Sequence, residues 1–196
     1  TDIQTYNLHV LNTNDTPVIS SVPDTIATED VLYSYQVVGE DVDQGDNLHY
    51  QFLTAPTGME IDDTSGLITW TPTNDAVGDT LVMIVVADDT AATDTQSFYL
   101  HIANVNDPPV ANNPMADFSV DEDSPRASFA LYDIFHDDDI SSVNDSLSFQ
   151  VVHDNQELIS AHTSDDSLHL SFLADQNGVV ILQLTAIDLD SASVSD

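Results

Sequence analysis

The chain has 196 residues, of which 41% are hydrophobic, and a formal net charge of −34 from 35 acidic residues against one basic residue, Arg126. One Arg and no Lys exclude nucleic acid as a partner, because phosphate binding needs clustered cations. They exclude attraction to an anionic membrane surface for the same reason. Because internal ion pairs cannot neutralise so many carboxylates, salt or bound metal must reduce their repulsion.

The acids are 30 Asp and only 5 Glu. Adaptation of an acidic surface to high salt would be expected to use both residues, whereas the short Asp carboxylate caps turns and ligates Ca²⁺. The absence of Cys excludes disulfides and thiolate metal sites. The longest apolar run, from Leu81 to Ala87, is too short to cross a bilayer. No signal peptide is visible and Thr1 stands partway into a repeat, so we expect a piece of a longer, exported bacterial protein.

Alternating apolar and polar residues follow one another along the chain, and helical periodicity is scarce. Short strands separated by Asp, Asn, Gly, Thr and Pro predict an all-β fold, with tandem Ig-like, Greek-key β-sandwiches. The apolar positions that share a face are, in chain order, Tyr6, Leu8 and Val10; Val31, Tyr33, Tyr35 and Val37; Leu48, Tyr50 and Phe52; Leu81, Met83 and Val85; Phe98, Leu100 and Ile102; Phe118 and Val120; Phe129 and Leu131; Leu147, Phe149 and Val151; Leu168, Leu170 and Phe172; and Val180, Leu182 and Leu184.

An internal repeat divides the chain. Residues 3–11 align with residues 95–103, and each copy runs into an Asn-x-Asn-Asp-x-Pro elbow, which ends at Pro17 in the first copy and Pro109 in the second. Self-similarity at a fixed offset indicates repeated units. We therefore expect the last strand and linker of a preceding repeat at 1–15, module 1 at 16–107, and module 2, without its final strand, at 108–196.

Several short motifs of module 1 occur together in a fixed order. They are Thr28-Glu29-Asp30, Asp41-Val42-Asp43, Thr64-Ser65-Gly66-Leu67-Ile68, Thr71-Pro72-Thr73, Val86-Ala87-Asp88 and Asn104-Val105-Asn106-Asp107-Pro108. Together they resemble the cadherin-like repeats of bacterial surface proteins, in particular the dystroglycan-type branch. Module 2 keeps fewer of them: Asp121-Glu122-Asp123, Asp137-Asp138-Asp139 and Ala186-Ile187-Asp188.

The resemblance implies Ca²⁺ at the joints between modules. Ca²⁺ takes six to eight oxygen ligands from carboxylates, amides and backbone, and Asp41, Asp43 and Asp88 stand at predicted strand ends. The implied site at the entrance of module 1 is Asn14, Asp41, Asp43 and Asp88. The implied site at the joint between the modules is Asn106, Asp137, Asp139 and Asp188, with Glu29, Asn104 and Asp107 added.

The chain also departs from the classical pattern. Asn12 and Asn104 stand where classical cadherins carry Asp, and the mid-module Asp-x-Glu segment is replaced by Thr71-Pro72-Thr73-Asn74-Asp75. We therefore expect one or two ions per joint rather than three. The alternative interpretation of the Asp pairs is polar turn residues on a solvated rim, and that of the elbow is a stiff linker that ends in proline.

The leading hypothesis is an extracellular or cell-surface module for adhesion or spacing, whose joints are stiffened by Ca²⁺. The alternatives are a carbohydrate-binding accessory module, which needs exposed aromatic residues, and a salt-adapted spacer without a specific ion. We expect Trp70 in the core and no enzyme activity. Expected partners are neighbouring repeats and other surface proteins or polysaccharide, with no direct membrane contact. Residues 3–11 of one molecule are expected to complete module 2 of another, head to tail.

Overall fold

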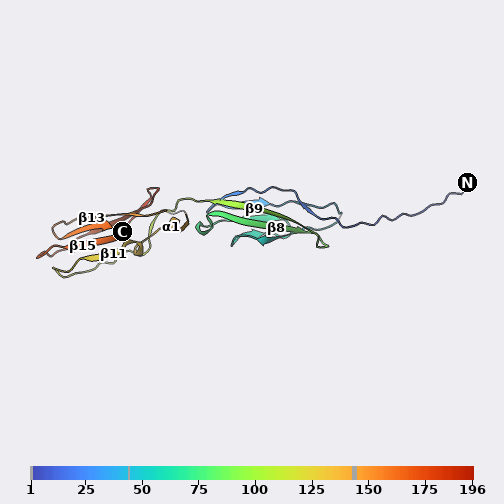
Figure 1. Cartoon of the computed structure of the whole chain (residues 1–196). Helices are drawn as coiled ribbons and strands as arrows, with labels where there is room; N and C mark the ends of the chain where they lie inside the picture. Colours follow the sequence, from blue (N-terminus) through green and yellow to red (C-terminus); the bar gives the residue numbers. More distant parts are fainter. Residues whose placement is uncertain (1, 44, 143–144) are drawn as a thin grey trace. The chain divides into compact units, whose positions relative to one another are not determined.

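The computed structural model describes residues 2–43, 45–142 and 145–196, and they form strands and turns with three one-turn helices. The chain divides into two compact units, Thr1–Val105 and Asn106–Asp196. We call these units module 1 and module 2 from here on (Figure 1). The prediction of an all-β, Ig-like fold is confirmed.

Module 1 contains two main sheets and a short additional strand pair. One sheet has the order β2-β9-β8-β5, the other has the order β3-β7-β6, and β1 pairs with β4. Every pairing is antiparallel except that of β2 with β9, which is parallel. The elements are β1 Val18–Ile19, β2 Ile26–Thr28, β3 Tyr33–Gln36, β4 Gly39–Glu40, β5 His49–Thr54, β6 Glu60–Ile61, β7 Leu67–Trp70, the 3₁₀ turn η1 Asn74–Ala76, β8 Gly78–Ala87 and β9 Thr93–Ala103.

The core of module 1 is built from alternate residues of these strands. Leu100 and Ile102 of β9 are fully buried, as the alternation predicts, and Trp70 is a core residue. The expectation for β8 was wrong in phase, because its fully buried residues are Val82, Ile84 and Val86 rather than Leu81, Met83 and Val85. Both faces of this strand are apolar, so the sequence pattern does not distinguish the face that packs inward.

Module 2 repeats much of this plan. Its sheets have the orders β11-β15-β14 and β13-β16-β17, and β10 pairs with β12. The elements are β10 Val110–Ala111, β11 Ala127–Ala130, the 3₁₀ turn η2 Leu131–Asp133, β12 Phe135–His136, the single-turn α1 Asp139–Ser142, β13 Ser148–His153, β14 Ile159–Ser164, β15 Ser167–Phe172, β16 Leu182–Ile187 and β17 Ser193–Ser195. The buried centre includes Phe135, Leu168, Leu170 and Leu184.

The predicted strand at Phe118 and Val120 does not form. These side chains are 45% and 46% exposed and lie outside any strand. In module 1 the matching strand, β2, pairs with residues 101–103 at the end of β9. Among the described residues of module 2, β17 ends at Ser195 and no strand pairs with residues 118–120.

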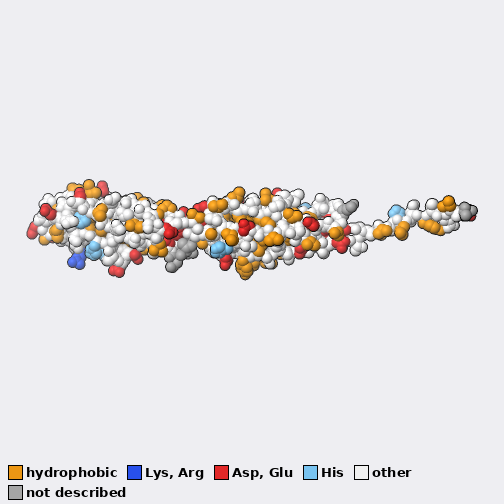
Figure 2. Space-filling model, turned by 90° about the horizontal axis from the view of Figure 1, so that it is seen from above, with side chains coloured by type: hydrophobic (Ala, Val, Ile, Leu, Met, Phe, Trp, Pro, Cys, Tyr) orange, Lys and Arg blue, Asp and Glu red, His pale blue; other side chains and the backbone are white. Residues whose placement is uncertain are grey.

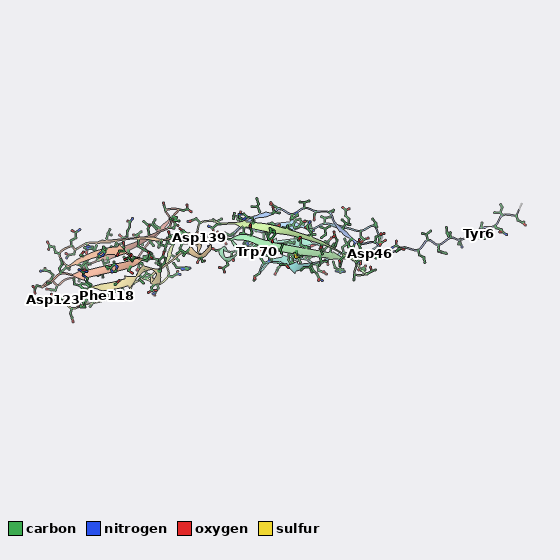
Figure 3. All side chains as sticks on the ribbon, viewed as in Figure 1. Tyr6, Asp46, Trp70, Phe118, Asp123 and Asp139 are labelled. Atoms are coloured by element: carbon green, nitrogen blue, oxygen red, sulfur yellow. The ribbon has the colours of Figure 1, made fainter. Side chains whose placement is uncertain are left out.

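Residues 3–11, which we call the arm, form no strand and make no sheet pairing in the structure. Figure 3 shows Tyr6 on this segment, which extends away from the body of module 1. The predicted inward-facing residues Tyr6, Leu8 and Val10 are between 83% and 88% exposed. Separately, among the described residues no helix has the length and hydrophobicity needed to span a membrane.

Candidate metal centres

In module 1, acidic residues from two loops and an Asn from the entering chain meet where the chain enters the sandwich. Asp41 and Asp43 follow β4, Asp88 follows β8, and Asn14 precedes β1. Asp43 and Asp88 are buried, with 9% and 4% of their surface exposed. Figure 3 shows Asp46, from the same loop as Asp41, at the end of the module from which the arm leaves.

Hydrogen bonds attach the entering chain to these carboxylates. The side-chain amide of Asn14 donates to Asp88 Oδ2 over 2.8 Å, and the amide of Asn12 donates to Asp43 Oδ1 over 2.7 Å. The backbone N–H of Asp15 donates to Asp43 Oδ2 over 2.7 Å. Both oxygens of Asp43 are therefore occupied by donors from the chain that enters the module.

Three carboxylate oxygens, one each from Asp41, Asp46 and Asp88, lie within 4.8 Å of one another. The Oδ2 atoms of Asp41 and Asp46 are buried and have no hydrogen-bond partner among the described residues. Because burying an unpaired charged oxygen costs free energy, this arrangement favours a cation among the three groups.

Asp88 is held in place by its own hairpin loop. Its Oδ1 accepts hydrogen bonds from the backbone N–H groups of Thr90 and Ala92, over 2.8 and 2.9 Å. The Asn14 amide, more than any other neighbour, lowers the pKa of Asp88 below its usual value, and these loop donors add to the effect. Asp88 is therefore kept ionised, as a metal ligand must be.

Asp46 has the opposite tendency. Loss of solvent raises its pKa first, and the negative charges of Asp43, Asp41, Asp88 and Asp89 raise it further. Like charges disfavour ionisation of a neighbouring carboxyl. A bound cation would reverse this effect, because it supplies the positive charge that the cluster lacks.

Module 2 repeats the arrangement at its own entrance. The Asn106 amide donates to Asp188 Oδ2 over 3.0 Å, and the Asp107 N–H donates to Asp139 Oδ2 over 2.7 Å. Asp139, the first residue of α1, is fully buried, and Asp137 and Asp188 are 2% and 5% exposed. The Asp139 N–H in turn donates to Asp137 Oδ1 over 3.0 Å.

The second cluster consists of Asp137, Asp145 and Asp188, whose closest oxygens again lie within 4.8 Å of one another. Asp137 Oδ2 and Asp145 Oδ2 are buried without a hydrogen-bond partner in the described part of the chain. Burial raises the pKa of Asp137 most, and Asp145 is the strongest of the charged neighbours that raise it further. In both modules, carboxylates at equivalent positions are removed from solvent and repel one another.

Glu29 and Asn104 lie at the other end of module 1. The Glu29 N–H donates to the Ala103 carbonyl oxygen over 3.1 Å, and a Glu29 carboxylate oxygen accepts from the Val105 N–H. They belong to a different unit from the Asp137 cluster. Their contribution to a joint site therefore stays a prediction.

Sequence reasoning missed Asp46 and Asp145. Each precedes an apolar strand by two residues, as Asp46-x-Leu48 and Asp145-x-Leu147, and follows the Asp-x-Asp motif within the same loop. Comparison of the two modules at this position would have identified both residues. The informative signal is that the Asp-x-Leu pattern occurs at the same place in both modules. A single Asp residue carries little information in a chain with so many of them.

The geometry suits Ca²⁺. Two oxygens on opposite sides of one Ca²⁺ lie about 4.6–5.2 Å apart, which is twice the usual Ca–O distance. One ion can therefore contact all three carboxylates of either cluster. Side-chain amides and backbone carbonyls of the elbow are additional oxygen ligands of the kind that Ca²⁺ accepts and that transition metals take less readily.

Residues 16–103 match the family described as "Putative Ig domain". The chain as a whole has an Ig-like, cadherin-like fold. Among solved structures, protocadherin gamma B2 extracellular domains 1–5 align with 95% of this chain at 19% identity and a TM-score of 0.57. Protocadherin gamma B7 extracellular domains 1–4 align with 92% of it at 18% identity and a TM-score of 0.53.

These similarities establish the fold of the repeats. The chain spans 38% of the gamma B2 structure and 48% of the gamma B7 structure. No curated protein matches the chain in sequence.

Proposed function

We propose that this chain is an extracellular spacer or adhesion segment whose modules each bind Ca²⁺ at the entrance of the chain. The observation that carries the proposal is the convergence of three carboxylates in each module, with two buried oxygens that have no hydrogen-bond partner among the described residues. In a chain with one cation among 36 charged residues, those oxygens have no protein partner to neutralise them.

The proposed mechanism is electrostatic. Without metal, Asp41, Asp46 and Asp88 repel one another across the entrance of module 1. With Ca²⁺, the same repulsion becomes coordination, and the loop after β4 is joined to the loop after β8. Because the elbow donates hydrogen bonds to Asp43 and Asp88, ordering these loops would also fix the direction in which the chain enters the module.

We extend the proposal to the segment between the modules. Asn106 and Asp107 bond to Asp188 and Asp139 of module 2, so Ca²⁺ at the Asp137 cluster would restrain this linker. Glu29 and Asn104 are proposed to contribute from module 1, as the cadherin resemblance implies. A series of restrained linkers would hold a string of repeats extended.

Calorimetric titration with Ca²⁺ after chelation tests the proposal. Extracellular sites of this type have dissociation constants of about 10⁻⁴–10⁻³ M. At 100 times the dissociation constant, each site would add about 2.7 kcal/mol of stability. Mg²⁺ at the same ionic strength should stabilise much less, because it demands a strict octahedral shell. Equal melting temperatures in chelator and in millimolar Ca²⁺ would reject the proposal.

Matched variants locate the sites. Asp46→Asn should remove the module 1 site and Asp145→Asn the module 2 site, so each variant should lose one part of the heat of binding. Asp75→Asn is the control, because Asp75 is an exposed residue of η1 outside both clusters. Small-angle scattering of Asp139→Ala in Ca²⁺ tests the linker, since an unchanged maximum dimension would argue against a role of Asp139 there.

The carbohydrate-binding alternative has less support. It requires an exposed aromatic platform, but Trp70 is only 5% exposed. Tyr35 packs edge-to-face on Phe98 inside module 1, and the exposed Tyr99 and Tyr132 belong to different modules. We therefore retain the calcium-bound spacer or adhesion segment, located at the cell surface, as the proposal.

A further inference from the structure

A polar depression lies on the outer face of the sheet β11-β15-β14 in module 2. It has a volume of about 340 Å³, at the lower end of the range for sites that hold small ligands. The side chains that border it include Arg126, His162, His169 and the hydroxyl groups of Ser128 and Ser171. Its lining shares no residue with the acid clusters, so it is separate from the candidate metal centres.

Strand alternation explains why these side chains share one face. Leu168 and Leu170 of β15 are buried in the core, so His169 between them points outward. In the antiparallel register, Ser128 of β11 and His162 of β14 lie opposite His169 on its two sides. The imidazole rings of His162 and His169 stack with their centres 5.2 Å apart and their planes inclined by 30°.

Arg126 and this His pair have no acidic partner in a chain with 35 acids. Within the described residues, Arg126 makes no ion pair or hydrogen bond, and the two imidazoles contact only each other in this way. By contrast, ring nitrogens of His49 and His101 in module 1 lie 2.9 and 2.8 Å from Asp oxygens. Arg126 is exposed and is the one blue side chain in Figure 2, close to pale blue His side chains. The depression therefore offers N–H donors and a positive charge that the described protein groups do not use.

Module 1 forms the same sheet without these groups. In the sheet order, β3, β7 and β6 take the places of β11, β15 and β14. Ser34 of β3 lies opposite the middle strand as Ser128 does in module 2. By this register, the module 1 counterparts of Arg126, His169 and His162 are Leu32, Thr69 and Glu60. Since the sheet folds with Leu, Thr and Glu at these positions, the cationic groups of module 2 indicate a role other than folding.

Unused N–H donors beside a positive charge favour an anion. A guanidinium forms two parallel, charge-assisted hydrogen bonds to one oxyanion, and imidazole N–H groups and Ser hydroxyls are additional donors. We propose that this depression binds the carboxylate or sulfate group of an acidic sugar. The volume is about ten times the share of one water molecule in the liquid, so it has room for a sugar ring as well as the acidic group. Asp165, which also borders the depression, repels a bare anion but accepts hydrogen bonds from sugar hydroxyls.

The net charge of −34 limits which acidic sugars bind. At physiological ionic strength, charges more than about 8 Å apart are largely screened. A single acidic group in contact with Arg126 therefore responds mainly to the local donors. A densely charged polymer would also meet the acidic surface around the depression, which repels it. The inferred ligand is thus a glycan whose acidic sugars are separated by neutral ones. Its recognition depends on charge rather than on ring stacking, so it needs no aromatic platform.

A transition metal is the competing ligand of a His pair. In the part of the chain that the structure describes, His162 and His169 belong to no group of three His or acidic ligand atoms within 4.8 Å of one another. Arg126 also places a positive charge at the same depression, and like charges repel. Both observations favour an anion over a metal cation.

NMR titration of the His ring and backbone amide signals tests the proposal, at a constant ionic strength of about 0.15 M. Sodium glucuronate and galactose 6-sulfate should each shift the ring signals of His162 and His169 and reach saturation. Glucose should not shift them. Affinities should agree in chelator and in millimolar Ca²⁺, so the result is independent of the proposed calcium sites. Inorganic sulfate that binds as tightly as galactose 6-sulfate would overturn the assignment to a sugar, and an equal response to glucose would overturn recognition by charge.

Matched variants locate the site. Arg126→Gln should weaken the binding of both acidic sugars at least about tenfold, because it removes a charge-assisted pair. The variant Arg126→Leu/His162→Glu/His169→Thr places the module 1 residues in module 2 and should abolish binding. Circular dichroism verifies that it folds. His101→Gln is the control, since it removes an exposed His of module 1 and should leave the affinity unchanged. Binding that persists in the triple variant would reject the proposal, as would a response of the His pair to Zn²⁺ but to neither sugar.

Discussion

The two modules share a plan, but the sequence reaches only the first residues of the last strand of module 2. In module 1, β9 has 11 residues and joins both β8 and β2. In module 2, β17 has three residues and joins β16 alone. Ile102 is fully buried in module 1, whereas Phe118 and Val120 are about half exposed in module 2. The second half of the last strand therefore closes the sandwich and gives the first strand its partner.

The largest effect expected from this comparison is at Leu100, which is fully buried in β9. Leu100→Ala should destabilise module 1 by about 2–5 kcal/mol, because it leaves a cavity in a closed core. Leu8→Ala, at the matching position of the exposed arm, should change the stability of the monomer by less than about 0.5 kcal/mol. Urea unfolding followed by fluorescence of Trp70 reports module 1. Similar costs for both variants would mean that the arm also packs on a core.

The hairpins of the second sheet differ as well. In module 1 the turn between β6 and β7 contains Gly66, whose φ is 71°. A Cβ added at this residue would lie 2.8 Å from the Val37 carbonyl oxygen. Gly66→Ala should cost about 2 kcal/mol or more, from left-handed strain and from this clash. Gly78→Ala adds a Cβ at φ of 106° with nothing within 4 Å, so it should cost less in the same urea experiment. The reverse order would refute the role of the clash.

Removing a carboxylate from an acid cluster should change the stability of the module in opposite directions with and without Ca²⁺. Burial and Asp145 raise the pKa of Asp137 in the folded state, so metal-free module 2 gains stability as pH falls through that raised pKa toward the unfolded value. Asp137→Asn removes this charge and should raise stability in chelator at pH 7, with little gain near pH 4. In millimolar Ca²⁺ the same change should lower stability. Thermal unfolding by circular dichroism measures both, and the same sign in both media would contradict a metal site.

Module 2 makes its own tight turn with Asp165 and Asp166, at φ of 48° and 57°. These residues connect β14 to β15 in a two-residue hairpin, for which Asn-Gly is the preferred pair. Asp165→Asn with Asp166→Gly should stabilise module 2 by up to about 1 kcal/mol. Equilibrium unfolding gives the change, and any loss of stability would indicate that the Asp carboxylates have a structural role.

The smallest effect concerns His49, whose place in module 2 is taken by Ser148. His49 Nδ1 lies 2.9 Å from Asp63 Oδ2, and this hydrogen bond raises the pKa of His49 above 6.5. The resulting stability is fully present below pH 6.5 and is lost as pH rises through the raised pKa. NMR titration should show that Asp63→Asn returns the His49 pKa toward 6.5. An unchanged His49 pKa would show that this hydrogen bond does not form in solution.

Much of the fold follows from local sequence. Alternation predicts the inward face of β9, where Leu100 and Ile102 stand on either side of His101, and the repeat predicts similar modules. Alternation does not set the phase of β8, because residues 81–87 are apolar on both faces. It also predicts a strand at Phe118, but strand formation there depends on a partner elsewhere in the sheet rather than on residues 118–120 themselves.

The candidate sites follow from sequence only in part. The elbow and the Asp-x-Asp motifs indicate Asn14, Asp41 and Asp88 because these residues stand at predicted strand ends. Asp46 and Asp145 enter the clusters through the paths of long loops, which local patterns do not determine. Asp43 was expected as a ligand, but its oxygens accept hydrogen bonds from Asn12 and Asp15 in the structure.

The parallel pairing of β2 with β9 has a mechanical consequence. In module 1, β2 is among the first strands along the chain, and β9 is the last and leads out of the module. Tension applied through the chain therefore slides one strand along the other, and all their hydrogen bonds and side-chain contacts must break together. A hairpin pulled from its open end releases its bonds one at a time. Since forced unfolding is governed by the unfolding rate, we expect the pairing of β2 with β9 to slow the unfolding of module 1 under tension.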